Sequence, residues 1–508
     1  MTEPINGEVA WIEAGQLPAQ RITATALTDL LGYWSAFDGP LYRLLANRIG
    51  RLADTSELPP GLRLPPEREL ATVLSVSRNT VAMAYQLLRD EGMAESRQGS
   101  GTRIMPPRTT PAAVHRANGY FARLLSSTAV DADLTIAAVD CAPQVAAALD
   151  DPATVLSAAQ RQAATSGIGY FPSGYPDLRA AIATMLTTRR ALPTRPEQII
   201  VTNGAQQALD LLIRCELVPG QPALVEDPTF PAMLDALQRA GSRPVGVPPG
   251  DVDRLERAVI THRPGLAYLI ATYHNPVGLS LPLETRQRLV TLARAHPEVV
   301  FIDDQVMASV TFTGVASPPP LAALAPALPN LVTVGSLSKT YWGGLRTGWI
   351  RASAGMIARL SAAKATADLG STAYQQAIVA ALIARDDDEI VRWRAGWLRP
   401  RYEAVASALR EFLPDWQWTR PEGGLTIWAR LPESYGADSG SFAQAALRNG
   451  VALVPGRLLS TSGDSGASRH VRLAFTQPPE TLQAAIKTLA SIAEPARISV
   501  VGPRQSRP

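Results

Sequence analysis

The amino-acid sequence predicts an α/β protein in which a small N-terminal helical unit precedes a much larger unit built on a parallel sheet. The chain has 508 residues, more than a single domain usually contains. Its N-terminal part holds short amphipathic helices separated by turn signals and ends in a glycine-tipped pair of strands. Beyond Asp131, apolar runs of β type alternate with helical stretches, which is typical of a largely parallel sheet.

Composition and charge exclude several classes of protein. Lys and Arg number 48 against 45 Asp and Glu, a formal net charge of +3, so any basic surface must be local. The two cysteines, Cys141 and Cys215, lie far apart without a nearby histidine cluster, which argues against a disulfide framework and a zinc site. Neither a secretion signal nor an apolar run of about 18 residues is present. We therefore expect a cytoplasmic protein without a metal site or a membrane span.

Residues 1–39 are predicted to form an N-terminal extension with one short amphipathic helix. Its apolar positions are Ile22, Leu27, Leu30, Leu31 and Trp34.

Residues 40–105 are predicted to form a compact unit of three helices and a hairpin. Its elements are a helix from Leu41, a breaker at Pro59-Pro60-Gly61, a helix after Pro66, a helix from about Arg78 to Glu91, and strands at 93–98 and 102–105 around a Gly-Ser-Gly tip. A tight turn separates the second helix from the third. This order is typical of a helix-turn-helix followed by a β-hairpin wing.

Small polar and basic side chains gather where this unit could meet DNA. The third helix opens with Ser77, Arg78, Asn79 and Thr80, which suits a recognition helix in the major groove. Further candidates for phosphate contacts are Arg68 on the preceding helix, Arg97 and Arg103 on the hairpin, and Gly99 and Gly101 at its tip. A lone arginine more often lies hydrated on a helix face without binding anything, but here these residues recur together, in register with the whole motif.

Three motifs of this unit strongly resemble the winged-helix domain of GntR-type regulators. They are Leu-Arg-Leu-Pro-Pro-Glu-Arg-Glu-Leu-Ala at 62–71, Val-Ser-Arg-Asn-Thr-Val at 76–81 and Arg-Gln-Gly-Ser-Gly-Thr at 97–102. The resemblance implies a double-stranded DNA operator as partner. A winged helix that serves only as a protein contact remains the alternative.

The rest of the chain divides into a linker at 106–130, a large domain at 131–497 and a tail at 498–508. The linker is rich in Pro, Thr and Ala and carries a weak helical pattern around Tyr120. The predicted strands of the large domain are Ile199–Thr202, Ala223–Glu226, Leu266–Ala271, Val299–Ile302 and Leu331–Val334.

Lys339 is the candidate amine nucleophile. The chain has only three lysines, and Lys364 and Lys487 lie in helical stretches where a solvated role is expected. Lys339 instead follows an apolar strand in a loop of small residues, with Ser336 and Arg346 close in sequence to bind a phosphate. This combination suits imine and phosphate chemistry.

Other polar residues end neighbouring strands. Asp303 could pair with a protonated ring nitrogen, although a strand-end aspartate is often only a cap. Asn275 could bind a ring hydroxyl, although alone it is a turn signal. Gly204, Ala205 and Gln206 open a helix after a strand, where backbone N–H groups can bind an anion.

Together and in this order, these residues resemble the fold type I aminotransferases over roughly Asp131 to Ala493. The resemblance implies pyridoxal 5′-phosphate bound to Lys339. Its phosphate would be bound by residues 204–206, Ser336 and Arg346. Its ring hydroxyl and ring nitrogen would be bound by Asn275 and Asp303. It also implies three further roles, namely ring stacking for Phe230, contact with the neighbouring subunit's cofactor for Tyr170, and a substrate carboxylate clamp for Arg472. A purely structural arginine is the alternative for Arg472.

One position departs from this family. Relatives place a tyrosine two or three residues after the ring aspartate, whereas Gln305 and Val306 stand here. Gln305 or Tyr341 could replace this hydrogen-bond donor. The departure predicts slow turnover.

A GntR-type reader fused to an aminotransferase-like domain resembles the MocR family of bacterial regulators. The resemblance implies a homodimer that reads paired half-sites and senses pyridoxal 5′-phosphate, or an amine or amino-acid effector that reacts with it. The effector would shift the populations of two dimer arrangements. Two alternatives stay open, a working aminotransferase that carries a DNA-binding domain and a regulator whose large domain is only a dimer scaffold.

Overall fold

The computed structural model describes residues 21–32, 34–35, 40–54, 57–90, 92–97, 101–105, 130–313, 317–386, 388–433, 439–461 and 466–498. Two compact units divide the chain, residues 1–116 and residues 117–508. The weak helix predicted around Tyr120 and the tip at Gly99 lie outside the described residues. Among the described residues, none of the helices combines the length and apolar content that crossing a bilayer requires.

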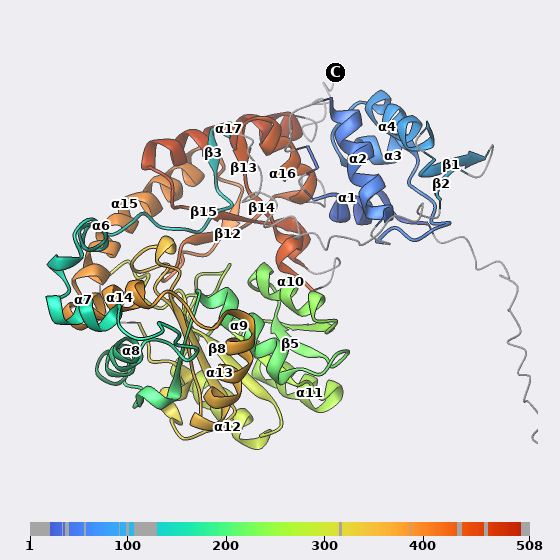
Figure 1. Cartoon of the computed structure of the whole chain (residues 1–508). Helices are drawn as coiled ribbons and strands as arrows, with labels where there is room; N and C mark the ends of the chain where they lie inside the picture. The colour runs from blue at the N-terminus through green and yellow to red at the C-terminus, as the bar shows by residue number, and fades with distance from the viewer. Residues whose placement is uncertain are drawn as a thin grey trace, which may run out of the picture. The chain divides into compact units, whose positions relative to one another are not determined.

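The first unit is a helical core with a β-hairpin (Figure 1). Its elements are α1 Ala24–Leu31, α2 Leu41–Asp54, α3 Glu67–Val73, α4 Arg78–Asp90, β1 Ala94–Arg97 and β2 Gly101–Ile104. The hairpin strands pair antiparallel, with Arg97 opposite Gly101. The Tyr85 hydroxyl of α4 donates to the carbonyl of Pro65 just before α3, so the two helices of the predicted helix-turn-helix are fixed to each other.

Helix α1 belongs to the core of this unit. Leu27 and Leu31 are fully buried among the leucines of α2, α3 and α4. Arg48 of α2 also donates hydrogen bonds to the carbonyls of Leu30 and Leu31, 2.6 and 2.9 Å long. The short helix of the predicted extension is therefore built into the winged-helix core.

The second unit is built on a seven-stranded sheet whose order is β4-β10-β9-β8-β7-β5-β6. The strands are β4 Ile199–Thr202, β5 Ala223–Glu226, β6 Pro244–Val247, β7 Leu266–Leu269, β8 Val300–Asp304, β9 Leu331–Ser336 and β10 Gly348–Arg351. Only β10 runs antiparallel to its neighbours in this sheet of described residues. The predicted largely parallel α/β fold is confirmed. Its strands are short and apolar because both faces are covered.

Helices cover both faces of this sheet (Figure 1). One face packs on α9, α10 and α13, and the other on α8, α11, α12 and α14. The helices of this unit are α6 Pro143–Asp150, α7 Ala158–Ala164, α8 Pro176–Arg189, α9 Ala205–Glu216, α10 Pro231–Arg239, α11 Val252–His262, α12 Leu283–Ala295, α13 Ala354–Asp368, α14 Ala373–Arg385, α15 Glu389–Phe412, α16 Ser439–Arg448 and α17 Pro479–Ile498. Because successive strand residues point to opposite faces, each strand end presents alternate side chains to two different layers.

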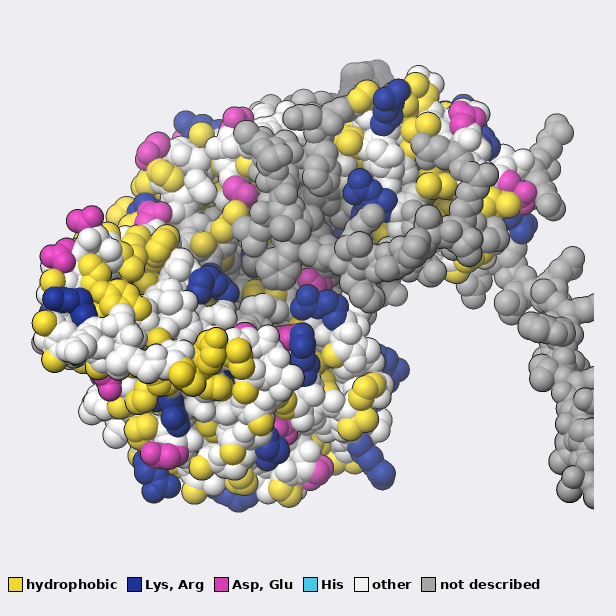
Figure 2. Space-filling view, viewed as in Figure 1, with side chains coloured by type: hydrophobic (Ala, Val, Ile, Leu, Met, Phe, Trp, Pro, Cys, Tyr) yellow, Lys and Arg dark blue, Asp and Glu magenta, His cyan; other side chains and the backbone are white. Residues whose placement is uncertain are grey.

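A smaller sheet, of order β11-β12-β15-β14, completes the second unit and packs with α15 and α17. Its strands are β11 Gln417–Trp418, β12 Thr426–Arg430, β14 Val454–Pro455 and β15 His470–Ala474, and a separate pair joins β3 Ala132–Asp133 to β13 Val451–Ala452. On the face seen in Figure 2, basic and acidic side chains are scattered among apolar ones over this unit, in line with the net charge of +3.

Candidate functional site

A cavity of about 500 Å³ lies at the C-terminal ends of the central strands. The structure brings together here most of the residues that the sequence predicted to bind a cofactor. These are Gly204, Ala205, Gln206, Phe230, Asn275, Ser336, Lys339 and Arg346. Strand ends of a parallel sheet with such a mixture of apolar and polar walls are where α/β proteins bind ligands.

Lys339 projects its amine into this cavity. The Nζ atom donates a hydrogen bond to the carbonyl of Ala137. Burial lowers the pKa of Lys339 to about 8, and the positive charges of Arg472 and Arg346 act in the same direction. Roughly a tenth of the amine is therefore neutral at pH 7, far more than for an ordinary lysine, and the neutral amine is the state that attacks a carbonyl carbon.

Ser336 organises the loop that carries Lys339. Its Oγ accepts from the backbone N–H of Ser338 at 3.1 Å, donates its single proton to the carbonyl of Thr347 at 3.1 Å, and lies 2.9 Å from the Ser338 Oγ. These bonds fix the chain between strand β9 and Lys339.

The start of helix α9 and Arg346 form an anion site on one wall. Gly204 has φ +82°, and a side chain on it would press against the Arg346 guanidinium at 3.1 Å. Gly348 packs so closely on Gly204 that a Cβ added to Gly348 would lie 2.6 Å from the carbonyl carbon of Gly204. Arg346 also donates to the carbonyl of Asn203 at 2.6 Å. Backbone N–H groups at a helix start and an adjacent guanidinium fit a phosphate.

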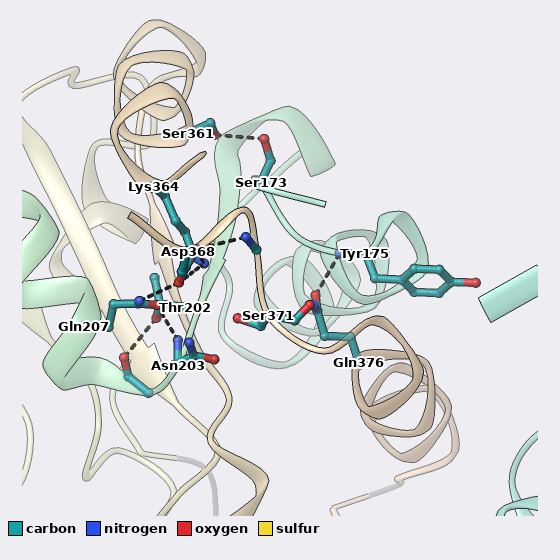
Figure 3. Close-up of polar contacts among 12 residues, drawn as sticks. Ser173, Tyr175, Thr202, Asn203, Gln207, Ser361, Lys364, Asp368, Ser371 and Gln376 are labelled. Atoms are coloured by element: carbon teal, nitrogen blue, oxygen red, sulfur yellow. Dashed lines mark hydrogen bonds and ion pairs between the residues drawn. The ribbon is translucent and has the colours of Figure 1, made fainter. Parts of the chain in front are cut away.

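A cluster of polar side chains around the buried Lys364 holds the loop before α9 in place (Figure 3). Lys364 and Asp368, one turn apart on α13, form an ion pair at 2.7 Å, and Asp368 also accepts from Gln207 at 2.7 Å. The Oε1 atom of Gln207 in turn accepts from the backbone N–H of Asn203 at 2.8 Å. Lys364 is only 1% exposed, so the expectation of a solvated lysine is wrong. Its charge is tolerated because Asp368 compensates it.

The carboxylate that faces the cavity is Asp304, and the structure thereby corrects the prediction for Asp303. Asp304 lines the cavity and is close enough to act on the charge of Lys339. Asp303 points to the opposite face of the sheet, where it accepts from the backbone N–H of Leu321 and from Gln305 at 2.7 and 2.8 Å. The two residues are consecutive at the end of β8, so their side chains diverge.

Tyr268 is a residue of this site that sequence analysis missed. It lies on β7, lines the cavity, and its hydroxyl donates to the Asp304 Oδ2 at 2.6 Å. Burial raises the pKa of Asp304 to about 6, and the hydrogen bond from Tyr268 opposes this rise. Burial and the Asp304 charge raise the pKa of Tyr268 well above its usual value, so the hydroxyl keeps its proton. In the sequence, nothing distinguishes Tyr268 from the other residues of an apolar strand.

Neither of the residues proposed to replace the missing tyrosine faces the cavity. Gln305 bonds to Asp303 and Arg190 on the opposite face, and the Tyr341 hydroxyl donates to Asp386 at 2.9 Å. Val306 and Met307 occupy the cavity wall after Asp304. This stretch of wall therefore offers apolar side chains where a hydroxyl was expected.

Arg472 lies behind the cavity wall. It is fully buried on β15 and donates to the carbonyl of Thr135 and, at 3.5 Å, to the Oδ1 atom of Asn275. Both Thr135 and Asn275 line the cavity, but Arg472 does not. Tyr170 is also outside the cavity, in the connection between α7 and α8, and is 60% exposed.

The other candidate interface is the start of α4 in the first unit. Ser77, Arg78 and Asn79 are exposed, and the Ser77 Oγ caps the helix by accepting from the backbone N–H of Thr80 at 3.0 Å. The Arg78 Nε atom pairs with Glu67 at 3.1 Å. Arg68 is exposed on α3. The structure thus presents this group at a helix N-terminus, as the sequence predicted.

Comparisons with known proteins match both units. Residues 41–104 match the model of bacterial regulatory proteins of the gntR family. Residues 142–489, more than half of the chain, match the model of class I and II aminotransferases. One relative, an uncharacterized HTH-type transcriptional regulator YdcR of Escherichia coli, is 28% identical over 83% of this chain and 92% of its own.

Two further matches cover more than half of the chain. The probable rhizopine catabolism regulatory protein MocR of Rhizobium meliloti is 31% identical over 62% of this chain and 65% of its own. The crystal structure of LysN, an alpha-aminoadipate aminotransferase of Thermus thermophilus complexed with N-(5′-phosphopyridoxyl)-L-leucine, superposes with a TM-score of 0.64 at 28% identity, over 76% of this chain and 97% of its own. The chain thus belongs to the class I and II aminotransferase family and, with a gntR-family domain ahead of that domain, has the make-up of the MocR-type regulators.

Proposed function

We propose that the protein is a DNA-binding transcription regulator whose larger domain binds pyridoxal 5′-phosphate through Lys339 and senses either this cofactor or an amine or amino acid that reacts with it. The observation that carries the proposal is the presence, in one chain, of an exposed helix start at 77–79 and of a cavity lined by residues that the sequence predicted to bind the cofactor. The match to YdcR, an HTH-type transcriptional regulator by its name, over 92% of that protein supports the same conclusion.

The residues of the cavity fit pyridoxal 5′-phosphate. The start of α9 with Arg346 would hold the phosphate, Phe230 would stack on the ring and Asn275 would bind the ring hydroxyl. Asp304 would pair with the ring nitrogen. When bound, the cofactor supplies an electron sink, and the Asp304 carboxylate strengthens it by keeping the ring nitrogen protonated.

Tyr268 should tune the charge of Asp304. Because Tyr268→Phe removes a hydrogen bond that favours the charged carboxylate, we expect it to raise the pKa of Asp304 above about 6. Cofactor affinity should fall as the pH drops through this pKa, since a protonated Asp304 cannot pair with a charged ring nitrogen. Spectrophotometric titrations between about pH 5 and 8 should show the fall at higher pH in the variant. Identical profiles for both proteins would contradict this role.

A homodimer is the expected assembly. In fold type I aminotransferases the site is shared between subunits, and the exposed position of Tyr170 leaves its ring available to a second copy of the chain. Two DNA-binding units related by a two-fold axis would read paired half-sites. The effector would act by favouring one of two dimer arrangements. Arg472 donates a hydrogen bond to the cavity residue Asn275. It would bind the carboxylate of an effector if the cavity wall opened toward it.

The experiment that tests the regulator function is sequencing of the DNA fragments retained by the full-length protein with and without cofactor. We expect specific fragments whose retention changes with the cofactor. Arg78→Ala should weaken binding to such a fragment by about 1–3 kcal/mol, as is typical for an arginine that contacts a base. Arg43→Ala removes an exposed arginine of α2 and is the matched control. Equal losses in both variants, or none, would remove α4 as the DNA reader, and Arg97→Ala would test the wing in the same way.

The second candidate is a working aminotransferase, which the match to LysN favours. The apolar wall at Val306 and Met307 argues instead for amine binding followed by slow proton transfer. We expect spectral changes with some amino acids but at most a slow half-reaction. Sustained turnover at about 1 s⁻¹ or faster with an amino donor and a keto acceptor would favour the enzyme over the sensor.

A further inference from the structure

Asp368, the last residue of α13, supports the anion site through a chain of hydrogen bonds (Figure 3). Its Oδ2 atom accepts from the Nε2 atom of Gln207 at 2.7 Å. The Oε1 atom of Gln207 accepts from the backbone N–H of Asn203 at 2.8 Å, and the carbonyl of Asn203 accepts from Arg346 at 2.6 Å. Three hydrogen bonds in series therefore connect Asp368 to the guanidinium that is expected to bind a phosphate.

The same carboxylate also fixes the turn that follows α13. Its Oδ1 atom accepts from the backbone N–H of Gly370 at 2.9 Å. Gly370 has φ +117°, and a Cβ added to it would lie 2.5 Å from the carbonyl oxygen of Phe171, so this turn packs tightly on the segment that follows Tyr170. Asp368 thus uses its two oxygens for donors from two different elements. A carboxylate supplies both acceptors, whereas an amide has a single oxygen.

The negative charge of Asp368 is unfavourable close to a phosphate site. Burial by itself would raise the pKa of Asp368, but hydrogen bonds from Lys364, Gln207 and the backbone of Gly370 lower this pKa below its usual value. The carboxylate is therefore ionised at neutral pH. A phosphate ester carries close to two negative charges at the same pH, so an uncompensated carboxylate in this network would weaken its binding.

Lys364 compensates this charge from a buried position. Its Nζ atom donates to both oxygens of Asp368 at 2.7 Å, and its side chain is 1% exposed against 23% for Asp368. A second pair with the same i,i+4 spacing, Asp210 and Arg214 on α9, is 34% and 68% exposed. Burying an ammonium group costs hydration free energy, so a gain in folding stability is a poor reason for a lysine at this position. Neutralisation of the carboxylate is a better one.

We propose that Lys364 is a positioning residue for the cofactor phosphate. It neutralises Asp368, which then orients Gln207 and Asn203 without repelling the phosphate. Through the carbonyl of Asn203 this order reaches Arg346. Lys364 is not part of the described cavity lining, so it acts through these residues and not by contact with the ligand. The inference rests on the proposed function, because that function supplies the phosphate.

Fluorescence titration of the full-length apoprotein with pyridoxal 5′-phosphate tests this role. Lys364→Met keeps the length of the side chain but removes its charge, and should weaken cofactor affinity about tenfold. This is the effect of one unit charge about 10 Å from another at an effective dielectric constant of about 20. Pyridoxal has no phosphate, so its attachment to Lys339 when added in excess, measured by borohydride trapping, should proceed as in the wild type.

Two further variants isolate the charge of Asp368. Arg214→Met removes the cation of the other i,i+4 pair, on the helix that opens the anion site, and should bind the cofactor as the wild type does. The double variant Lys364→Met/Asp368→Asn removes the repelling charge as well. It should bind the cofactor about threefold more tightly than Lys364→Met, because relief of the repulsion outweighs the loss of one hydrogen bond.

Three results would overturn the role of Lys364. They are unchanged cofactor affinity in Lys364→Met, equal losses for pyridoxal 5′-phosphate and pyridoxal, or a double variant that binds no more tightly than the single one. Thermal unfolding checks that each variant folds, and Lys364→Gln, which keeps a donor for Asp368, repeats the test if Lys364→Met does not fold. Stabilisation of the apoprotein by inorganic phosphate gives the same comparison without the cofactor. Failure of the wild type to bind the cofactor would therefore count against the proposed function alone.

Discussion

Replacing Lys339 with alanine is expected to abolish covalent binding of pyridoxal 5′-phosphate. Lys339 is the lysine whose amine reaches the cofactor cavity, whereas Lys364 is held by Asp368 and Lys487 lies over the ring of Phe412. Borohydride reduction followed by peptide mass spectrometry should place the cofactor on Lys339 in the wild type and on no lysine in Lys339→Ala. Lys487→Ala is the matched control and should be labelled like the wild type. A reducible link that survives in Lys339→Ala would show the assignment to be wrong.

The same reaction should depend on pH through Lys339. Only the neutral amine attacks the cofactor aldehyde, and burial lowers the pKa of Lys339 to about 8. The rate of cofactor attachment to the apoprotein should therefore rise with pH and level off above about pH 8, instead of rising up to the range of an ordinary lysine. A rate still increasing steeply toward pH 10 would contradict the lowered pKa.

Asp304→Asn is expected to weaken cofactor binding far more than Asp303→Asn does. Removing one partner of a buried charge pair typically costs about 3–5 kcal/mol, which corresponds to a loss of roughly 100-fold or more in affinity. Asp303 is directed to Leu321, Gln305 and the arginines of the opposite face, so its replacement should lower the free energy of unfolding and leave cofactor affinity close to that of the wild type.

Fluorescence titration of the apoprotein with cofactor, together with thermal unfolding, separates these two effects. The two variants are matched controls for each other, since both replace a buried carboxylate by an amide at adjacent positions of β8. Loss of cofactor binding in Asp303→Asn with retention in Asp304→Asn would show that the ring carboxylate is Asp303.

Much of the site could be predicted from sequence because it depends on local signals. Gly204 precedes a helix, so an anion site follows from backbone geometry alone, and Lys339 stands out because lysines are scarce. The recognition-helix start at Ser77 is likewise a local capping pattern, and the structure bears out the cap.

The burial of charged and polar side chains was harder to predict. Lys364 looked solvated because a lysine in a helix usually is, but α13 packs its charged side against the loop before α9, where Asp368 and Gln207 compensate the charge. Helix α1 was predicted to be a separate extension. Its apolar pattern shows that it has a buried face but does not indicate the surface on which Leu27 and Leu31 pack.

The sequence by itself determined the order of the two domains, the lysine, the anion-binding turn and the helix that opens with Ser77, since each follows from residues adjacent in the chain. Only the tertiary structure decided which of Asp303 and Asp304 faces the cofactor cavity and that Tyr268 is its partner. The physical reason is that neighbouring strand residues point to opposite faces, and the choice of face depends on the layers that pack against the sheet.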